Sequence, residues 1–162
     1  MKLNFDYWRF KFRPFKWDDL YNVQALINVI AQDEAIPYHY SLEWLYFVLD
    51  QTGVNATQSC FVATLESDRL IGFSRYEVHD DPCRWTVQAG VHPEFKGIGI
   101  GRWLIAVNDF NALRHRPQSA PLIVHRQSSP QNPSATALLK YVGYHTVESE
   151  DDTVLHWEKQ LR

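Results

Sequence analysis

The sequence lacks most of the features that mark membrane, disulfide-rich and metal-binding proteins. It contains no apolar run of membrane-spanning length and no apolar signal core near residue 1, so we expect a cytoplasmic protein. Its two cysteines, Cys60 and Cys83, lie far apart without CxxC spacing, which favours reduced thiols over a disulfide framework. Its seven histidines show neither HxH nor HExxH spacing, so we expect no metal site.

The sequence also lacks a strong charge of either sign. Sixteen Lys and Arg residues stand against 19 Asp and Glu residues, for a net charge of −3. A field this weak gives no reason to expect nucleic acid or an anionic membrane as a partner. The basic residues near the N-terminus alternate with aromatic ones, which is typical of a solvated strand face: Lys2, Arg9, Lys11, Arg13 and Lys16.

What the sequence does contain is the composition of one packed domain, which we place at residues 1–162. It is 45% hydrophobic and 14% aromatic. A domain of this length buries roughly two-thirds of the surface that its unfolded chain exposes, so its core needs no disulfide or metal to be stable. No internal repeat, low-complexity tract or linker divides it.

Periodicity and end signals along the chain predict a mixed α+β fold. Strands are predicted over 5–13, 59–65, 70–78, 84–91, 121–125, 144–148 and 153–158. Helices are predicted over 18–30, 41–50, 98–114 and 132–142. This order combines antiparallel runs with strand–helix–strand units. It therefore indicates a single α+β domain, with a mixed central sheet of about seven strands flanked by about four helices.

A glycine-rich turn, Lys96-Gly97-Ile98-Gly99-Ile100-Gly101, lies between a predicted strand and a predicted helix. Glycine lets backbone N–H groups approach a phosphate closely and lets the chain take strained angles. The first turn of a helix adds unpaired N–H donors and the positive end of the helix dipole. Lys96 and Arg102 could add charge, so the turn indicates an anion site. On the turn alone, a flexible loop without a ligand stays open.

The spacing of these glycines excludes the commonest nucleotide motifs, because neither GxxxxGK[ST] nor GxGxxG is present. The segment VHPEFKGIGIGRWL, residues 91–104, instead resembles the central motif of the GNAT acetyltransferase superfamily, V-x-P-x-[YF]-[QR]-x-x-G-x-[GA] followed by a helix. Arg13-Pro14 followed by Asp18-Asp19-Leu20 resembles the family's opening. A third resemblance is to the family's closing motif, which is matched at Asn132, Ala135, Leu138, Gly143 and Tyr144.

The resemblance implies that acetyl-CoA is the co-substrate, and that its acetyl group passes directly to the amine of a small molecule or peptide. It also implies that strand 84–91 splays from strand 121–125 and exposes backbone N–H groups to the coenzyme. The coenzyme-binding residues implied are Val91, Lys96, Gly97, Ile98, Gly99, Ile100, Gly101, Arg102 and Asn132. Lys96 departs from the usual Gln or Arg, which keeps a charge but loses a bidentate fork. The alternative for Asn132, which stands before Pro133, is that it only caps a helix and does not contact the coenzyme.

Direct transfer needs a base for the amine proton, a donor for the oxyanion and a way for the thiolate to leave. The family usually places a tyrosine acid seven residues after the helix-opening Asn, and here that residue is Leu139. Tyr141 is turned by roughly 200° from Leu139 and should face elsewhere. For the base we favour Glu77, which could equally be an exposed strand carboxylate; His92 and His125 are further candidates.

The acceptor site is expected in the aromatic loop after Pro37, at Tyr38, His39 and Tyr40. Leu139 favours a second hypothesis, in which the chain is a non-catalytic or degenerate acyl-CoA-binding module. An exposed edge of the last hairpin could pair with a second copy, which makes a homodimer possible.

Overall fold

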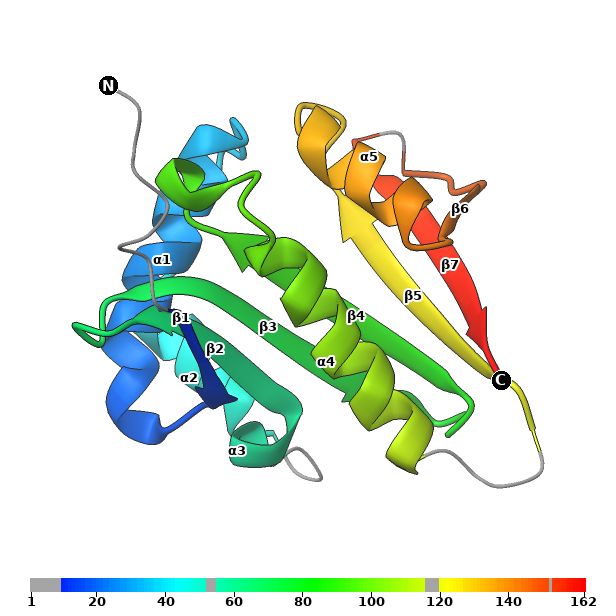
Figure 1. Ribbon diagram of the computed structural model, residues 1–162, viewed down its shortest axis with the longest axis horizontal. Helices are drawn as coiled ribbons and strands as arrows, with labels where there is room; N and C mark the ends of the chain where they lie inside the picture. Colours follow the sequence, from blue (N-terminus) through cyan, green and yellow to red (C-terminus); the bar gives the residue numbers. More distant parts are fainter. Residues whose placement is uncertain (1–9, 52–54, 116–119, 152) are drawn as a thin grey trace.

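A seven-stranded mixed sheet forms the centre of the computed structural model, which describes residues 10–51, 55–115, 120–151 and 153–162 (Figure 1). The strands are β1 (Phe10–Pro14), β2 (Cys60–Leu65), β3 (Leu70–Val78), β4 (Arg84–Val91), β5 (Leu122–Ser128), β6 (His145–Val147) and β7 (Leu155–Leu161). Their order in the sheet is β1-β2-β3-β4-β5-β7-β6. Only β4 and β5 pair in parallel, and the other pairs are antiparallel. The predicted α+β fold with a mixed sheet is confirmed.

Five helices of the described chain cover the sheet. They are α1 (Leu20–Asp33), α2 (Leu42–Leu49), α3 (Ala56–Ser59), α4 (Ile100–His115) and α5 (Pro133–Tyr141). Helix α4 crosses the front of the sheet in Figure 1, and α1 and α2 lie behind it. Alternation along β3 explains the two layers, since Ser74 bonds Asn108 of α4 while Phe73 packs with Val23 and Leu26 of α1.

The boundaries differ from prediction where polar residues or glycines serve a tertiary role. Strand β5 runs to Ser128 rather than 125, because its polar end lies beside a cleft rather than in a loop. Helix α4 begins at Ile100 rather than 98, because Gly97 and Gly99 take positive φ angles of 80° and 97°. The short helix α3 was not predicted. Residues 5–9 of the first predicted strand lie outside the described residues.

The corner between β1 and α1 is closed by an ion pair. Arg13 donates to both carboxylate oxygens of Asp19, at 2.6 Å and 2.8 Å, and the Lys16 backbone N–H donates to one of them at 2.9 Å. The hydrogen bond from Arg13 is the main cause that lowers the pKa of the buried Asp19 and raises that of Arg13. This corner joins the edge strand β1 to the first helix.

Replacing Asp19 by asparagine should lower the free energy of unfolding by about 2 kcal/mol at pH 7, since hydrogen bonds to charged groups contribute about that much. A carboxyl whose folded pKa is lowered stabilises the fold above its unfolded pKa, and this contribution is lost as pH falls through the folded pKa. Urea denaturation curves of Asp19→Asn and wild type should therefore begin to converge as the pH falls below the ordinary carboxyl pKa of about 3.9, and should coincide below the folded pKa of Asp19. Asp18→Asn, at the exposed neighbour, is the control; an equal loss there would contradict the role of the pair.

Candidate active site

Strands β4 and β5 separate halfway along their length. They pair only from Arg84 with Ile123 to Val87 with Arg126. Beyond that point β4 stays paired with β3 as far as Val91, and β5 stays paired with β7 as far as Ser128. The facing backbone groups of the two strands therefore have no sheet partner on this side, and Figure 1 shows the strands diverging. The predicted splay is confirmed.

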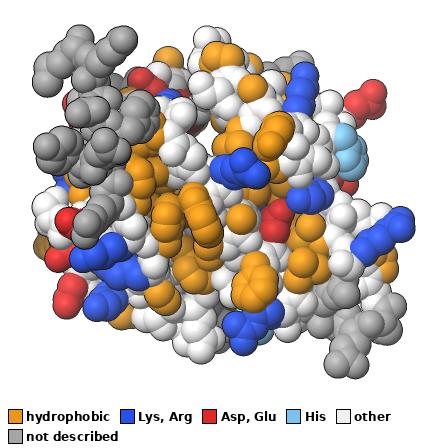
Figure 2. Space-filling model, in the orientation of Figure 1, with side chains coloured by type: hydrophobic (Ala, Val, Ile, Leu, Met, Phe, Trp, Pro, Cys, Tyr) orange, Lys and Arg blue, Asp and Glu red, His pale blue; other side chains and the backbone are white. Residues whose placement is uncertain are grey.

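A cleft of about 330 Å³ lies in this opening. Its walls come from β4, the glycine turn, the first turns of α4, the end of β5 and α5. Glu34, at the end of α1 on the other side of the sheet, also lines it. The cleft therefore reaches both faces of the sheet. Figure 2 views the molecule from the α4 and α5 side, where Lys and Arg side chains stand among hydrophobic ones.

The glycine turn exposes backbone to the cleft. Gly97 and Gly99 have positive φ angles, and nothing lies within 4 Å of the position that a Cβ would occupy on either. Helix α4 starts directly after Gly99, so the unpaired N–H groups of its first turn stand at the cleft. Gly101 serves packing instead, because a Cβ there would meet the Leu138 side chain at 3.1 Å. This geometry suits an anion such as a phosphate.

Most of the predicted coenzyme residues come together at this cleft. Those that line it are Val91, Lys96, Gly97, Gly99, Gly101, Arg102 and Asn132. The side chains of Ile98 and Ile100 do not line it; they pack with the cluster around Phe95 and Leu104 and anchor the turn to the core. The prediction thus located the turn, while alternate side chains point into the core.

The charged side chains around the turn already have protein partners. Lys96 Nζ lies 2.5 Å from Asp33 Oδ2. Its charge is therefore paired within the protein, whereas the sequence pattern predicted that it would add charge to the anion site. Arg102 lies over the ring of Tyr141 at 5.4 Å. Tyr141 is 72% exposed, as expected for a surface residue at a helix end, but its ring also lies at the rim of the cleft.

Asn132 links the two sides of the cleft. Its Oδ1 accepts from the Ala135 N–H at 3.0 Å, which caps α5 as predicted. Its Nδ2 donates to Glu34 Oε1 at 2.5 Å, across 98 positions of sequence. The helix-capping role and a position on the cleft therefore occur together.

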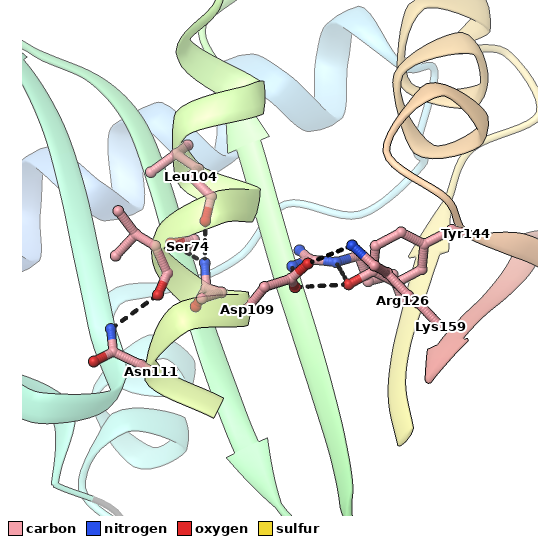
Figure 3. A network of polar contacts seen from close by, with 9 residues as sticks. Ser74, Leu104, Asp109, Asn111, Arg126, Tyr144 and Lys159 are labelled. Atoms are coloured by element: carbon pink, nitrogen blue, oxygen red, sulfur yellow. Dashed lines mark hydrogen bonds and ion pairs between the residues drawn. The ribbon is translucent and has the colours of Figure 1, made fainter. Parts of the chain in front are cut away.

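Arg126, which lines the cleft, belongs to a polar network between α4, β5 and β7 (Figure 3). Asp109 of α4 accepts from Arg126 of β5 at 3.1 Å, from the Tyr144 hydroxyl at 2.9 Å and from Lys159 of β7 at 3.1 Å. Arg126 Nε also donates to the Tyr144 oxygen at 2.8 Å. Burial raises the pKa of Tyr144 above its ordinary range. Arg126 is not among the site residues predicted from the sequence, because the predicted strand ends at 125 and a polar strand end resembles a loop.

The usual acid position is filled by a buried apolar side chain. Leu139 is 5% exposed, lines the cleft and packs with Val87 and Val124. It has no proton to donate. Within the described chain, the tyrosine nearest to it in sequence, Tyr141, lies at the exposed rim rather than at the inner end.

The candidate bases lie on the sheet face away from α4. Glu77 pairs in register with Thr86, which pairs with His125, which pairs with Glu158. Glu77 is partly exposed, 3.5 Å from Arg75, and does not line the cleft. His125 lies one residue before the last β4–β5 pair, with Nε2 3.1 Å from His156 Nδ1. Like Glu77, it does not line the cleft. Burial, with the neighbouring His156, lowers the pKa of His125 below 6.5.

The third candidate, His92, has a local structural role. Its ring accepts the Glu94 N–H at 3.3 Å and lies 3.4 Å from Arg69. It does not line the cleft.

The predicted acceptor residues lie beside a separate, more open hollow. Tyr38 and His39 border it together with Asn28 and Gln32 of α1. Tyr40 is held by its backbone, which bonds the Asn28 side chain, and its ring packs at a tilt against that of Trp44, with the ring centroids 4.7 Å apart. The structure therefore keeps these residues near one another but does not bring them into the cleft.

Two features of the described residues bear on other functions. No helix there is both long and apolar enough to cross a bilayer. No three of its His, Cys, Asp and Glu side chains are arranged so that they could hold a metal ion.

The split sheet, the glycine turn and the cleft define an α+β domain whose geometry between two strands suits an anion such as a phosphate. Residues 17–144 match the acetyltransferase (GNAT) family, which is most of the chain. The chain belongs to that family.

Solved structures share this fold at low sequence identity. The GCN5-related N-acetyltransferase of Sphaerobacter thermophilus superposes with a TM-score of 0.77 at 20% identity, over 85% of this chain and 44% of that protein, so this chain spans less than half of it. The PaiA N-acetyltransferase of Thermoplasma acidophilum, in complex with coenzyme A, superposes with a TM-score of 0.73 at 16% identity. The match covers 94% of this chain and 99% of that protein. The YncA protein of Salmonella typhimurium, with its cofactor acetyl-CoA, superposes with a TM-score of 0.70 at 15% identity, and the match covers 94% of each chain. No curated protein matches the sequence as a relative.

Proposed function

We propose that the chain transfers an acetyl group from acetyl-CoA to the amine of a small molecule or peptide. The observation that carries this proposal is the glycine turn opening into the cleft between the splayed ends of β4 and β5. Membership of the acetyltransferase family and the coenzyme present in two structural neighbours support it.

Different residues of the cleft bind different parts of acetyl-CoA. Backbone N–H groups from Gly97 to Arg102 take the pyrophosphate, since the helix start is a natural anion site. The unpaired edge of β4 up to Val91 takes the amide-bearing pantetheine arm. Asn132 adds a polar side chain from α5. The apolar inner end, with Val87 and Leu139, excludes water from the thioester.

The proposal is tested by two measurements on the purified chain. Saturating acetyl-CoA should raise the Tm, because a ligand that binds only the native state stabilises it. Free thiol should then be released from acetyl-CoA in the presence of amines, tested over polyamines, aminoglycosides and peptide N-termini. No Tm shift at millimolar acetyl-CoA would contradict coenzyme binding, and thiol release only with alcohols would contradict N-transfer.

We propose His125 as the base, because it lies on β5 one residue before the point where β4 and β5 separate; Glu77 is the competing candidate. His125→Gln should lower kcat/KM by about a hundredfold or more, the usual contribution of a general base. In the wild type, kcat/KM should fall at acid pH with an inflection below 6.5, since the neutral imidazole is the active form. His125→Gln should remove this inflection. His115→Gln, an exposed histidine on α4, is the control. If Glu77→Gln removes the inflection instead, Glu77 is the base.

The second candidate function is an acyl-CoA-binding module without turnover, which the buried Leu139 favours. Both candidate functions predict that acetyl-CoA raises the Tm, but only the enzyme is expected to release free thiol. Tight binding of acetyl-CoA with no thiol release over the whole amine panel would establish this alternative.

A further inference from the structure

The polar network around Arg126 contains more positive than negative charge. Arg126 and Lys159 both bond Asp109, which is the only carboxylate among the described residues that bonds either of them. The Tyr144 hydroxyl stays neutral, because burial raises its pKa. Two cations and one anion leave a net charge of +1. Lys159 is partly exposed, so water screens part of this charge, whereas Arg126 is buried and shares its carboxylate with a second cation. A buried cation that is only partly compensated is costly, which indicates a role for it.

The surroundings of Arg126 supply no second anion. Its neighbours across the sheet are Val87 of β4 and Trp157 of β7, and both are apolar. Leu139 of α5 belongs to the same apolar cluster. Asp109, Tyr144 and Lys159 are the titratable groups that bond within the network from α4, the start of β6 and β7. A ligand anion in the cleft would therefore supply the further counter-charge to Arg126.

Arg126 borders that cleft directly. It is 3% exposed, yet it lines the cleft beside the last β4–β5 pair, where the strands begin to separate. Its Nε and Nη2 are held by Tyr144 and Asp109, while Nη1 bonds no described residue. A guanidinium carries five N–H donors, so donors remain for a ligand. The cation is fixed in place before any ligand arrives, which is the condition for electrostatic stabilisation of a developing charge.

We propose that Arg126 stabilises the coenzyme A thiolate as it leaves, in place of the proton donor that Leu139 cannot be. This inference rests on the proposed acetyl transfer. The amine nitrogen attacks the thioester carbonyl carbon, the C–N bond forms, and the C–S bond breaks with its electron pair going to sulfur. The proton of the amine goes to the base. Arg126 keeps its protons throughout, and the thiolate neutralises the surplus charge.

The test is the ionisation of the product thiol, which needs coenzyme A alone and no acceptor. Free thiols have a pKa of about 8.5. The thiol of bound coenzyme A, followed by thiolate absorbance in the ultraviolet, should titrate about one unit lower, with roughly tenfold more thiolate at pH 7. The background variant is Cys83→Ser, since burial raises the pKa of Cys60 to about 11 and keeps that thiol protonated.

Three variants assign the effect. Arg126→Met should return the bound thiol to the free value or above. Lys159→Met makes the network neutral without touching the cleft and should reverse part of the shift, which keeps the test valid if Arg126→Met does not fold. Arg114→Gln removes an exposed cation of α4 that stacks on Phe110 and should change nothing.

The outcomes separate this inference from the proposed function. A bound thiol that titrates as free coenzyme A in the wild type overturns the role of Arg126, even if amines are acetylated. A shift that survives in both Arg126→Met and Lys159→Met also overturns it. A lowered value that these variants raise supports the thiolate site, even if no amine in the panel is acetylated. Failure to bind coenzyme A overturns both.

Discussion

Replacing Gly99 by alanine is expected to weaken coenzyme A binding by tenfold to a hundredfold. Gly99 has a φ of 97°, which strains an L-residue by about 1–2 kcal/mol. The added Cβ would also occupy the empty space at the cleft, where no protein atom lies within 4 Å. Each 1.4 kcal/mol lost costs a factor of ten in affinity. Calorimetric titration with coenzyme A, together with the Tm of the free chain, measures both effects.

Gly143 provides a matched control for this substitution. Its φ is 92°, almost that of Gly99, but it follows α5 and does not line the cleft. Gly143→Ala should lower the Tm about as much as Gly99→Ala and leave coenzyme affinity unchanged. Equal losses of affinity in the two variants would show that backbone strain alone, and not the phosphate site, explains the result.

Replacing Asp109 by asparagine is expected to lower the free energy of unfolding by about 3–5 kcal/mol. The change removes the carboxylate that both Arg126 and Lys159 bond, and it leaves the buried Arg126 uncompensated beside the partly exposed Lys159. Breaking a buried pair from one side costs this much because the remaining charge stays uncompensated. Urea denaturation at pH 7, read as a midpoint shift at constant m-value, measures it.

Two variants test the charge explanation. Asp81→Asn removes an exposed carboxylate 3.8 Å from Arg84 and should cost less than about 1 kcal/mol. The double variant Asp109→Asn with Lys159→Met removes one of the stranded cations and should recover part of the loss. If the double variant is as unstable as the sum of the two single variants, the hydrogen-bond geometry of Asp109 matters rather than its charge.

The stability and the chemistry of this site are coupled through the same residues. Asp109 stabilises Arg126 in the core, while Lys159 leaves the network one charge in excess. A fully neutral network would hold Arg126 with less strain but would offer the cleft less positive potential. On the proposal that Arg126 holds the thiolate, its incomplete compensation lowers stability in favour of function, as functional sites commonly do.

Local pattern was enough to predict the types of all the elements except α3, the mixed sheet and the position of the glycine turn. Periodicity and end signals act between near neighbours, so Ser41 and Asn132 could be predicted as helix starts from their residue types. The turn at Gly97 and Gly99 is likewise a property of consecutive residues, because only glycine takes those φ angles without strain. These features need no knowledge of what lies across the sheet.

Tertiary structure alone decided which charges meet. Asp109 is 17, 35 and 50 positions from Arg126, Tyr144 and Lys159, and no local signal joins them. Strand register brings His125 into line with Glu77 through Thr86, and helix packing closes Lys96 onto Asp33. The sequence by itself determined where a phosphate could bind. The cation at the inner end of the cleft depends on register and packing, since a side chain's charge acts on whatever the fold places within a few ångströms of it.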